Sequence, residues 1–565
     1  MEAGLNARAV GEFASAEQLL RRALDAAPDD YRAYQFLGAL LIDRDDKVEG
    51  LEILERGADI AGPLTRDTMG IYNNLANALR CNERYDEGEK LLRELVRIGP
   101  NEWQHWHNLA QLLSNTKRPD ETVAAIRRAI ALEPGYGPNH AVLGVALIET
   151  GRLLSAQNAL QRCLDLGWDA DPTVWTHLAS TYRMQGDAQR ALELLQHVLD
   201  TTGPAPSPLN NLGIVLNLLG RFDEAHEHFR HGIELDPDDS TWRANYGYSL
   251  LTAGVVTEGW ELWEYGLDNG PRGCERPLLK GRRWVPTDTD GRVLCYREQG
   301  VGDEILFASC LPDLERAAHD VVYEADTRLI PLFTRSFPGI EVRAQTFNPT
   351  IGPLQHDFDT AIPVGSLPRH FRPTADHFPK DRQSFLVADP EATEHWRARL
   401  TELAGGNAIV GISWRSRIKS AERRLEYTHL YEWGELFAIP GVTWVNLQYD
   451  DCDRELVAAE REFGISIANW RDVDYMNDFD TVAAIMSVCD LVVAPRNAVA
   501  MLSGALGVPT VMMGNRWDWS DLGTDTSPWF PAVDLVYRHV GEDWDQVLAT
   551  AAAKVRAVAS RKETS

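Results

Sequence analysis

The chain has 565 residues, a length that predicts about three to four domains. Hydrophobic residues make up 44% and charged residues 25%, so a disordered chain is excluded and a folded, soluble protein is expected. Acidic residues outnumber basic ones by 84 to 56, and the formal net charge of −28 argues against nucleic acid or an anionic membrane as the main partner.

No targeting or membrane segment is recognisable. The longest uninterrupted apolar run, AVLGVALI at 141–148, is far shorter than the roughly 20 residues that cross a bilayer. The N-terminus lacks the basic-then-apolar layout of a signal peptide. The 7 cysteines are scattered without a C-x-x-C pair, which is typical of reduced, mostly buried thiols. We therefore expect a cytoplasmic protein without a membrane span.

A repeat of 34 or 35 residues organises the first half of the chain. It is seen when six positions are aligned, each followed by Ala or Gly: Leu75, Leu109, Leu143, Leu178, Leu212 and Tyr246. Small residues let two helices cross closely, and prolines such as Pro100 and Pro134 favour the turn to the next pair. The period and these positions resemble the tetratricopeptide repeat (TPR). With two weaker units before residue 65, they predict a superhelix of about eight helix pairs over residues 1–270.

Such an array predicts a concave groove that holds a peptide. The residues just before the aligned positions are Asn74, Asn108, Val142, His177, Asn211 and Asn245. Asparagine carries a donor and an acceptor on one short side chain, so a column of asparagines can pair with an extended backbone of any sequence. This ladder resembles the one in the TPR superhelix of O-GlcNAc transferase, and we assign its asparagines and His177 to peptide binding. The alternative is that each Asn bonds the neighbouring repeat.

The second half alternates short β-rich runs with helical ones, after a connection at 271–291 that is rich in Gly, Pro and charge. Strands are predicted at 292–296, 321–325, 340–344 and 360–364, and, after a helix at 391–404, at 408–414, 442–448, 465–469, 491–494 and 509–513. A last helix is predicted near 543–561. The alternation predicts an α + α/β protein with two doubly wound, Rossmann-like domains, at 292–390 and 391–565, facing a cleft at the carboxyl ends of the strands.

Most general catalytic motifs are missing from the sequence. There is no G-x-x-x-x-G-K-[ST], H-E-x-x-H or G-x-S-x-G, which removes the common ATPase, metalloprotease and serine-hydrolase classes. GVGDEI at 300–305 is not a complete dinucleotide fingerprint. His226, His228 and His231 fall on one predicted helix without a paired carboxylate, so we expect no metal site there.

Four segments follow one another in strand-turn-helix contexts: REQGVGDEILFASCLPDL, GISWRSRIKS, DFDTVAAIMSVCDLVVAPRNAVAMLSGALGVPTVMM and TSPWFP. At these residues the chain resembles GT-B glycosyltransferases related to bacterial heptosyltransferases, over 290–535. With its repeats it also resembles TPR-bearing protein O-glycosyltransferases, including those that modify flagellin. The resemblance implies a nucleotide-sugar co-substrate, no metal or other cofactor, and transfer to Ser or Thr of a protein such as flagellin.

The first loop of the α/β half contains two candidate bases. Gly300 and Gly302 allow a tight turn with the backbone close to a ligand, and Asp303 stands where the next helix begins. The same Asp position is the proposed base in the heptosyltransferases that the chain resembles. The alternative role for Asp303 is that of a helix N-cap. Glu298 is the second candidate.

The donor site is predicted from three further segments. The first carries Trp414, Arg415, Ser416, Arg417 and Lys419, where Arg415 can bond a phosphate with two prongs and Lys419 acts as a point charge. Its alternative is a solvated charged loop. Asn497 begins a helix whose N–H groups form a second anion site. Gln448 and Tyr449, at the end of a strand, are candidates for recognising the base of the nucleotide.

One turn departs from the family that the chain resembles. There it reads like S-V-D-T-S-V-A-H, with the Asp and the His facing the donor sugar, and Arg496 and Met501 take those two positions here. Because Arg496 can pair with a carboxylate, we hypothesise an anionic sugar, a nonulosonic acid carried on CMP. The same change also fits a TPR adaptor whose GT-B half has lost catalysis. A third interpretation keeps the enzyme but makes its acceptor a glycan or lipid.

Overall fold

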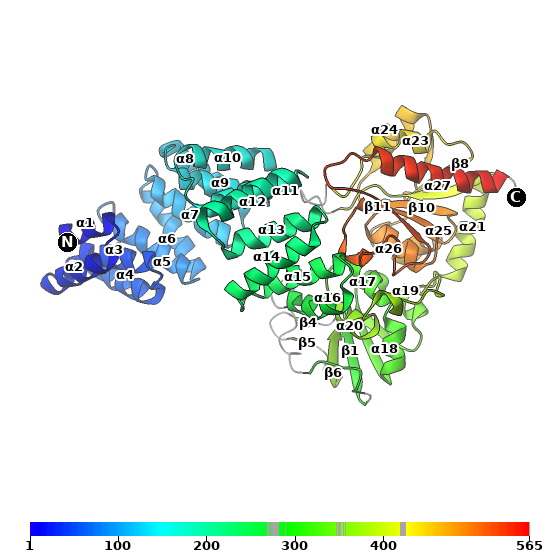
Figure 1. Ribbon diagram of the computed structural model, residues 1–565, viewed down its shortest axis with the longest axis horizontal. Coiled ribbons are helices and arrows are strands. Elements are labelled where there is room, and N and C mark those ends of the chain that lie inside the picture. The colour runs from blue at the N-terminus through cyan, green and yellow to red at the C-terminus, as the bar shows by residue number, and fades with distance from the viewer. Residues whose placement is uncertain are drawn as a thin grey trace. The chain divides into compact units, whose positions relative to one another are not determined.

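The computed structural model describes residues 1–267, 272, 282–288, 290–345, 347–348, 352–353, 355, 357–417 and 425–563. Lys419 and most of the expected connection at 271–291 lie outside the described residues. The chain divides into two compact units, Met1–Thr181 and Tyr182–Ser565. Figure 1 labels the elements of both.

Sixteen α-helices in succession form the repeats of the described residues 1–267. They are α1 (Glu2–Ala9), α2 (Phe13–Ala26), α3 (Tyr31–Asp43), α4 (Lys47–Ala61), α5 (Met69–Cys81), α6 (Tyr85–Ile98), α7 (Trp103–Asn115), α8 (Pro119–Leu132), α9 (Gly137–Glu149), α10 (Leu153–Asp165), α11 (Pro172–Met184), α12 (Ala188–Thr202), α13 (Pro206–Leu218), α14 (Phe222–Leu235), α15 (Ser240–Thr252) and α16 (Val256–Trp263). Eight antiparallel pairs result, which confirms the predicted TPR array.

The small residue after each aligned position is required by the packing within a helix pair. A Cβ atom added at Gly144 on α9 would lie 2.6 Å from Cγ of Leu160 on α10. One added at Gly213 on α13 would lie 2.6 Å from Cζ of Phe229 on α14. Such distances are too short for carbon atoms, so a larger side chain would force the two helices apart.

The first α/β domain is built on a four-stranded sheet in the order β3-β2-β1-β6, with all pairings parallel. The strands are β1 (Arg292–Tyr296), β2 (Asp320–Ala325), β3 (Glu341–Ala344) and β6 (Thr360–Pro363), and the helices are α17 (Val301–Ala308), α18 (Leu311–Ala317), α19 (Ile330–Ser336) and α20 (Leu367–Phe371). A two-residue pairing of β4 (Phe347–Asn348) with β5 (Gly352–Pro353) was not predicted.

The second α/β domain has a six-stranded parallel sheet in the order β12-β11-β10-β7-β8-β9. Its strands are β7 (Ala408–Ile412), β8 (Val442–Asn446), β9 (Ile467–Ala468), β10 (Leu491–Pro495), β11 (Thr510–Asn515) and β12 (Val533–Arg538), and its helices are α21 (Pro390–Ala404), α23 (Gly434–Phe437), α24 (Asp453–Phe463), α25 (Phe479–Met486), α26 (Ala498–Ala505) and α27 (Asp545–Glu563). The strand order reverses between β7 and β10, which is where doubly wound sheets bind ligands. The predicted α + α/β class is confirmed, and the two sheets are consistent with a GT-B fold.

The last repeat packs directly on both α/β domains within the second unit. Helix α16 lies against α20 (Figure 1), and the indole N–H of Trp263 donates a hydrogen bond of 2.9 Å to the carbonyl of Gly365. The ring of Trp519, from the 3-10 helix η7 (Trp519–Asp521), lies 4.7 Å from the ring of Trp263 and 5.8 Å from that of Phe307. Aromatic rings at such distances attract one another beyond their burial. The last repeat and the two α/β domains therefore share one core.

The remaining short 3-10 helices of the described residues are η1 (Glu264–Leu267), η3 (Thr327–Leu329), η4 (Val364–Ser366), η5 (Ala375–His377) and η6 (Leu430–Glu432). Among the described cysteines, Cys81, Cys163, Cys295, Cys310, Cys452 and Cys489 are free thiols. None of the helices described here combines the length and the apolar character that a membrane crossing requires.

Candidate functional site

A cavity of about 400 Å³ lies between the two α/β domains. Its wall comes from the loop after β1 on one side, and from the loops after β7, β8, β10 and β11 on the other. Nine of the residues named in the sequence analysis line it: Gly300, Gly302, Asp303, Ser416, Arg417, Tyr449, Arg496, Asn497 and Met501. Glu298, Trp414, Arg415 and Gln448 are not part of this wall.

Asp303 takes part in capping α17 but is not its N-cap, which is Gly300. It is the third residue of α17, and its Oδ2 accepts a hydrogen bond of 3.3 Å from the backbone N–H of Gly300, which is one half of a capping box, since glycine has no side chain to supply the other half. The same side chain lines the cavity. Capping orients the carboxylate, and its place in the wall makes it accessible to a substrate hydroxyl.

The two glycines of this loop do not make its turn. Gly300 has φ −86° and ψ 168°, an extended conformation open to any residue, and the left-handed residue of the loop is Gln299 with φ 56°. A Cβ atom added at Gly302 would lie 3.6 Å from Cα of Ala498, an ordinary contact. The expected tight glycine turn is therefore corrected: the glycines are not required by backbone conformation, and they leave the cavity wall without side chains.

Glu298, the second candidate base, is buried beside Arg272, with 2.8 Å between its Oε1 and Nη2 of that arginine. Burial raises the pKa of Glu298 to about 7, against the lowering effect of the Arg272 charge. Arg272 has no exposed side-chain surface and also bonds Glu264 at 3.1 Å. Glu298 thus anchors a residue of the connection to the first α/β domain, away from the cavity wall.

Arg415 is neutralised by carboxylates of its own domain. Its guanidinium pairs with Asp450 and, at 2.7 Å, with Glu455. Gln448 fixes the same loop, because its Oε1 accepts hydrogen bonds of 3.2 Å and 3.3 Å from the backbone N–H groups of Trp414 and Arg415. The indole of Trp414 donates to Glu455 at 3.1 Å. These three residues hold the loop after β7 in place; Trp414 and Arg415 do so without lining the cavity, whereas Gln448 also lines the adjoining hollow at the end of β8.

Arg417, two residues further along, keeps its charge available. It is exposed and lines the cavity, and its Nη1 lies 3.5 Å from Sδ of Met476. Within the described residues no carboxylate pairs with it, whereas the cavity arginine Arg328 is held by Asp326 at 2.8 Å. Sequence inspection placed Arg417 in the right loop but preferred Arg415, since the pairing of Arg415 depends on residues 35 and 40 positions away.

Arg496 also has a partner already. Its Nη1 and Nη2 lie 2.8 Å and 2.9 Å from the two carboxylate oxygens of Asp521, and Nη1 lies 2.8 Å from Oγ of Ser520. Burial alone would lower the pKa of Arg496, but Asp518 and Asp521 raise it above its usual value. The charge expected to meet a sugar carboxylate is thus balanced within the protein.

Asn497 caps α26 and ties it to the loop after β7. Its Oδ1 accepts hydrogen bonds from the N–H groups of Val499 and Ala500 at 3.0 Å and 3.2 Å, and its Nδ2 donates to Oγ of Ser413 at 3.0 Å. Asn497 and Ala498 line the cavity, so the positive end of the α26 dipole faces the cavity.

A second hollow of about 330 Å³ adjoins the cavity at the carboxyl ends of β8 and β9. Tyr449 and Met476 line both spaces. The hydroxyl of Tyr449 donates to Oγ of Ser416 at 3.1 Å, which connects the loop after β8 to the loop after β7. Trp470 and the carboxylates of Asp451 and Asp453 also line this hollow.

The asparagine ladder bonds neighbouring repeats. Asn74 Nδ2 donates to the carbonyl of Gln35 at 3.3 Å, and Asn108 Nδ2 donates to Oδ1 of Asn73 at 2.9 Å. In the second unit Asn245 Nδ2 donates in the same way to Asn210 at 2.9 Å. Asn211 bonds the carbonyl of Ser207 on its own helix at 3.0 Å. The repeat-to-repeat alternative is thus present at three of these sites, while His177 lines a groove instead.

Metal binding has no evident site in the described part of the chain. No group of three or more His, Cys, Asp or Glu residues there is arranged to hold an ion.

The chain is similar to known proteins both in its repeats and over most of its length. Family models described as tetratricopeptide repeat match residues 1–63, 70–112, 105–136 and 171–238. Protein FlbA of Caulobacter vibrioides is 30% identical over 568 residues, an alignment covering 90% of this chain and 93% of that protein. Protein O-mannosyl-transferase TMTC3 of Homo sapiens is 24% identical over 204 residues, covering 34% of this chain and 22% of that protein. The crystal structure of the APC/C hetero-tetramer Cut9-Hcn1 matches 46% of this chain and 50% of its own with a TM-score of 0.40 and 18% identity.

Proposed function

This chain belongs to the FlbA family, over an extent that includes the α/β domains as well as the repeats, and we propose that it is a glycosyltransferase. It transfers a sugar from a nucleotide-sugar to Ser or Thr of a protein that the repeats hold. The observation that carries this proposal is the cavity between the α/β domains, with the carboxylate of Asp303 on one side and a cation and a helix N-terminus on the other.

The chemistry assigns one role to each side of the cavity. The acceptor oxygen attacks the anomeric carbon while the bond from that carbon to the phosphate oxygen breaks, and Asp303 accepts the hydroxyl proton. Negative charge then develops on the departing nucleotide, where Arg417 and the positive end of the α26 dipole, at Ala498 in the cavity wall, stabilise it. The start of α26 is fixed before the reaction, because Asn497 caps the helix and bonds Ser413 at the end of β7.

The adjoining hollow suits the nucleoside of the donor. Tyr449 and Trp470 supply aromatic surface, and Asp451 and Asp453 supply acceptors for ribose hydroxyls or for the exocyclic amino group of cytosine. A net negative hollow disfavours further phosphate groups. This balance favours a donor with one phosphate, and CMP-activated sugars are of that class.

A nonulosonic acid donor bound through Arg496 would require a rearrangement of the Arg496 ion pair. Because Asp521 holds Arg496 through two bonds, a sugar carboxylate must displace Asp521 to reach that guanidinium. Turnover with a CMP-nonulosonic acid and none with UDP-GlcNAc would support this version, and the reverse result would remove it. Flagellin is the first acceptor to test, and intact mass measures the sugar added.

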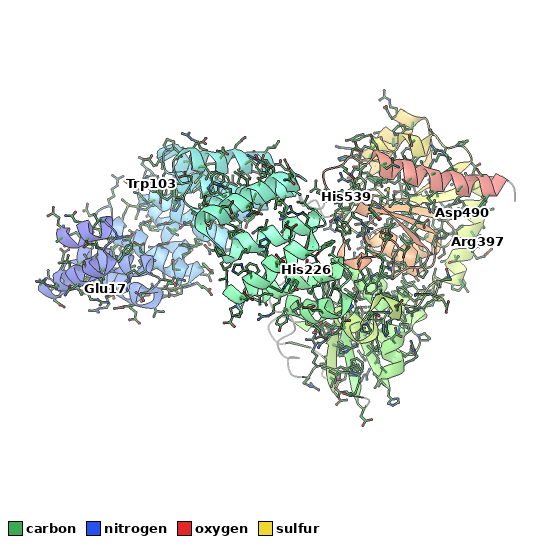
Figure 2. All side chains as sticks on the ribbon, in the orientation of Figure 1. Glu17, Trp103, His226, Arg397, Asp490 and His539 are labelled. Carbon is green, nitrogen blue, oxygen red and sulfur yellow. The ribbon has the colours of Figure 1, made fainter. Side chains whose placement is uncertain are left out.

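Asp303→Asn is the variant that tests the enzyme. Asparagine is nearly isosteric and also caps helices, so the fold is retained while the base is lost, and transfer is expected to fall by about 10²- to 10⁴-fold. Arg397→Ala is the control, since Arg397 is an exposed residue of α21 labelled in Figure 2 and forms no part of the cavity wall. Full activity of the Asp303 variant would overturn the proposed mechanism.

A non-catalytic adaptor is the second candidate, and the Arg496–Asp521 pair favours it, because Arg496 stands in the turn where related enzymes face the donor sugar and Asp521 of η7 already holds it. An adaptor would bind its protein partner but show no turnover with any nucleotide-sugar. An enzyme acting on a glycan or lipid would instead retain activity after Asn74, Asn108, Asn211 and Asn245 are replaced by alanine.

A further inference from the structure

Arg328 is a cavity arginine that comes from the first α/β domain. It belongs to η3, which follows β2, and β2 lies beside β1, whose loop carries Asp303. Its side chain is 28% exposed and lines the cavity, as does the side chain of Arg417 from the second α/β domain. The two domains therefore each contribute a guanidinium group to the same space.

The ion pair of Arg328 leaves one end of its guanidinium accessible. Asp326 accepts hydrogen bonds from Nε and Nη2, at 2.8 Å and 2.9 Å, which fixes the plane of the group. The remaining nitrogen, Nη1, makes a long hydrogen bond of 3.4 Å to the carbonyl oxygen of Met476. Arg496 differs, because both of its terminal nitrogens bond Asp521. Pairing through Nε and Nη2 orients Arg328 and still leaves a terminal nitrogen for a ligand.

Asp326 does not neutralise Arg328 by itself, because its carboxylate is shared. Nη1 of Arg297 lies 2.9 Å from Oδ2 of Asp326, and Nε of Arg297 lies 2.9 Å from Oε2 of the fully buried Glu304. Burial raises the pKa of Glu304 to about 7, against the lowering effect of Arg297. Near pH 7 this carboxyl is partly neutral, so the two arginines and two acids together carry a net positive charge.

Arg328 and Arg417 approach the same residue of the second domain, Met476. Arg328 reaches its carbonyl oxygen, and Nη1 of Arg417 lies 3.5 Å from its Sδ. A carbonyl at long range and a thioether sulfur are weak acceptors for two cations. An anionic oxygen that enters here can replace both with charge-assisted hydrogen bonds, which are stronger.

We infer that Arg328 and Arg417 form one anion subsite, built from both α/β domains, for an anionic group of the nucleotide-sugar: its phosphate, or a carboxylate on the sugar itself. This inference rests on the proposed function, and it adds a cation of the first domain to the donor site. A donor bound in this way bridges the two domains on the wall that also carries Asp303.

The test measures dissociation constants by isothermal titration calorimetry on the full chain. The probes are CMP, CMP-N-acetylneuraminic acid, UDP and UDP-N-acetylglucosamine. Arg328→Ala should weaken the nucleotide-sugar that the unaltered chain binds best by roughly tenfold or more, because a hydrogen bond between charged groups is lost. The fold should be retained, since Asp326 keeps its pair with Arg297, and the unfolding temperature checks this.

The probes also identify the anion. If the nucleotide without its sugar weakens as much as the nucleotide-sugar, the subsite holds the phosphate. If CMP-N-acetylneuraminic acid weakens while CMP does not, the subsite holds the sugar carboxylate. Unchanged affinity for every probe, or no binding of any probe to the unaltered chain, would overturn the inference.

A double-mutant cycle asks whether the two arginines share one anion. Groups with a common partner have non-additive effects, so the loss in the Arg328→Ala, Arg417→Ala double variant should differ from the product of the single losses by roughly threefold or more. A double loss equal to that product would mean two independent sites and would also overturn the inference.

Arg335→Ala is the matched control. Arg335 also joins the first domain to the second, through Asp480 of α25, but it forms no part of the cavity wall. Its replacement should leave the affinities unchanged. If it weakened binding as much as Arg328→Ala does, the effect would come from the contact between the domains and the anion subsite would be wrong.

Failure of the inference is distinguishable from failure of the proposed function. If Asp303→Asn abolishes transfer while Arg328→Ala has no effect on binding, the enzyme stands and the subsite falls. If both arginines are needed for binding but no nucleotide-sugar is turned over, the subsite stands and the enzyme falls.

Discussion

Arg415 and Arg417 stand two residues apart on one loop, and replacing each with alanine should have opposite consequences. Arg417 is exposed on the cavity wall and has no carboxylate partner in the described residues. A hydrogen bond to a charged group contributes about 1.5–3 kcal/mol. Arg417→Ala is therefore expected to lower kcat/KM for the nucleotide-sugar by roughly 10- to 150-fold, with an unchanged unfolding temperature.

Arg415→Ala should mainly affect stability. It removes the cation that Asp450 and Glu455 share, and these two carboxylates then repel one another. Breaking a fully buried pair costs about 3–5 kcal/mol, but 13% of the Arg415 side chain and 39% of the Glu455 side chain remain exposed to solvent, so we expect about 2 kcal/mol. Below its unfolding temperature this variant should keep most of its activity.

Two measurements decide between the roles. Differential scanning fluorimetry gives the unfolding temperature, and mass spectrometry of the acceptor gives the rate of transfer, with Arg397→Ala as the common control. Loss of activity in the Arg415 variant without loss of stability, together with full activity of the Arg417 variant, would refute the assignment of the phosphate site.

Three further changes test the fold around the site. Gly144→Val would place its Cβ 2.6 Å from Cγ of Leu160, so the free energy of unfolding should fall by about 1–3 kcal/mol in thermal melts followed by circular dichroism; an unchanged melt would contradict the packing argument. Because burial raises the pKa of Glu298 from 4.5 to about 7, its stabilising contribution is full below pH 4.5 and is lost as the pH rises through about 7. Glu298→Gln should flatten that decline in unfolding temperature, and an identical pH profile would count against the raised pKa. Trp263→Ala removes the contact with the Trp519 ring and should cost about 3–5 kcal/mol while also weakening nucleotide-sugar binding, measured by calorimetry; unaltered affinity would separate the last repeat from the cavity.

The repeats and most of the strands are predictable because their signals are local. A period of 34 residues and runs such as RVLCY and AIVGI record helix packing and buried strands directly in the sequence. Strand β12 was missed because it follows Pro531 at the edge of the sheet, and only its two end residues are buried. An edge strand lacks the continuous apolar run by which a central parallel strand is recognised.

The site is predictable to the level of its loops. Gly300, Asp303, Ser416 and Asn497 follow strands whose carboxyl ends meet at the cavity, and chain order is enough to select them. Whether each charged side chain is already paired within the protein could not be predicted, because the pairing depends on residues distant in sequence. Nothing near Arg496 indicates that residue 521 holds it.

The aromatic core at Trp263 and Trp519 limits which repeats can be added, lost or exchanged without disturbing the α/β domains. Only the hairpins that lie wholly within the first unit, Met1–Thr181, can be duplicated, deleted or exchanged on this argument, because later repeats also contact the α/β half: the ring of Phe222 on α14 lies 5.1 Å from that of Trp517, and Gly186 lies close to Gly541. The hairpins from α11 onward are therefore inherited with the α/β domains, and a chimera that borrows another arm should be spliced ahead of Pro172.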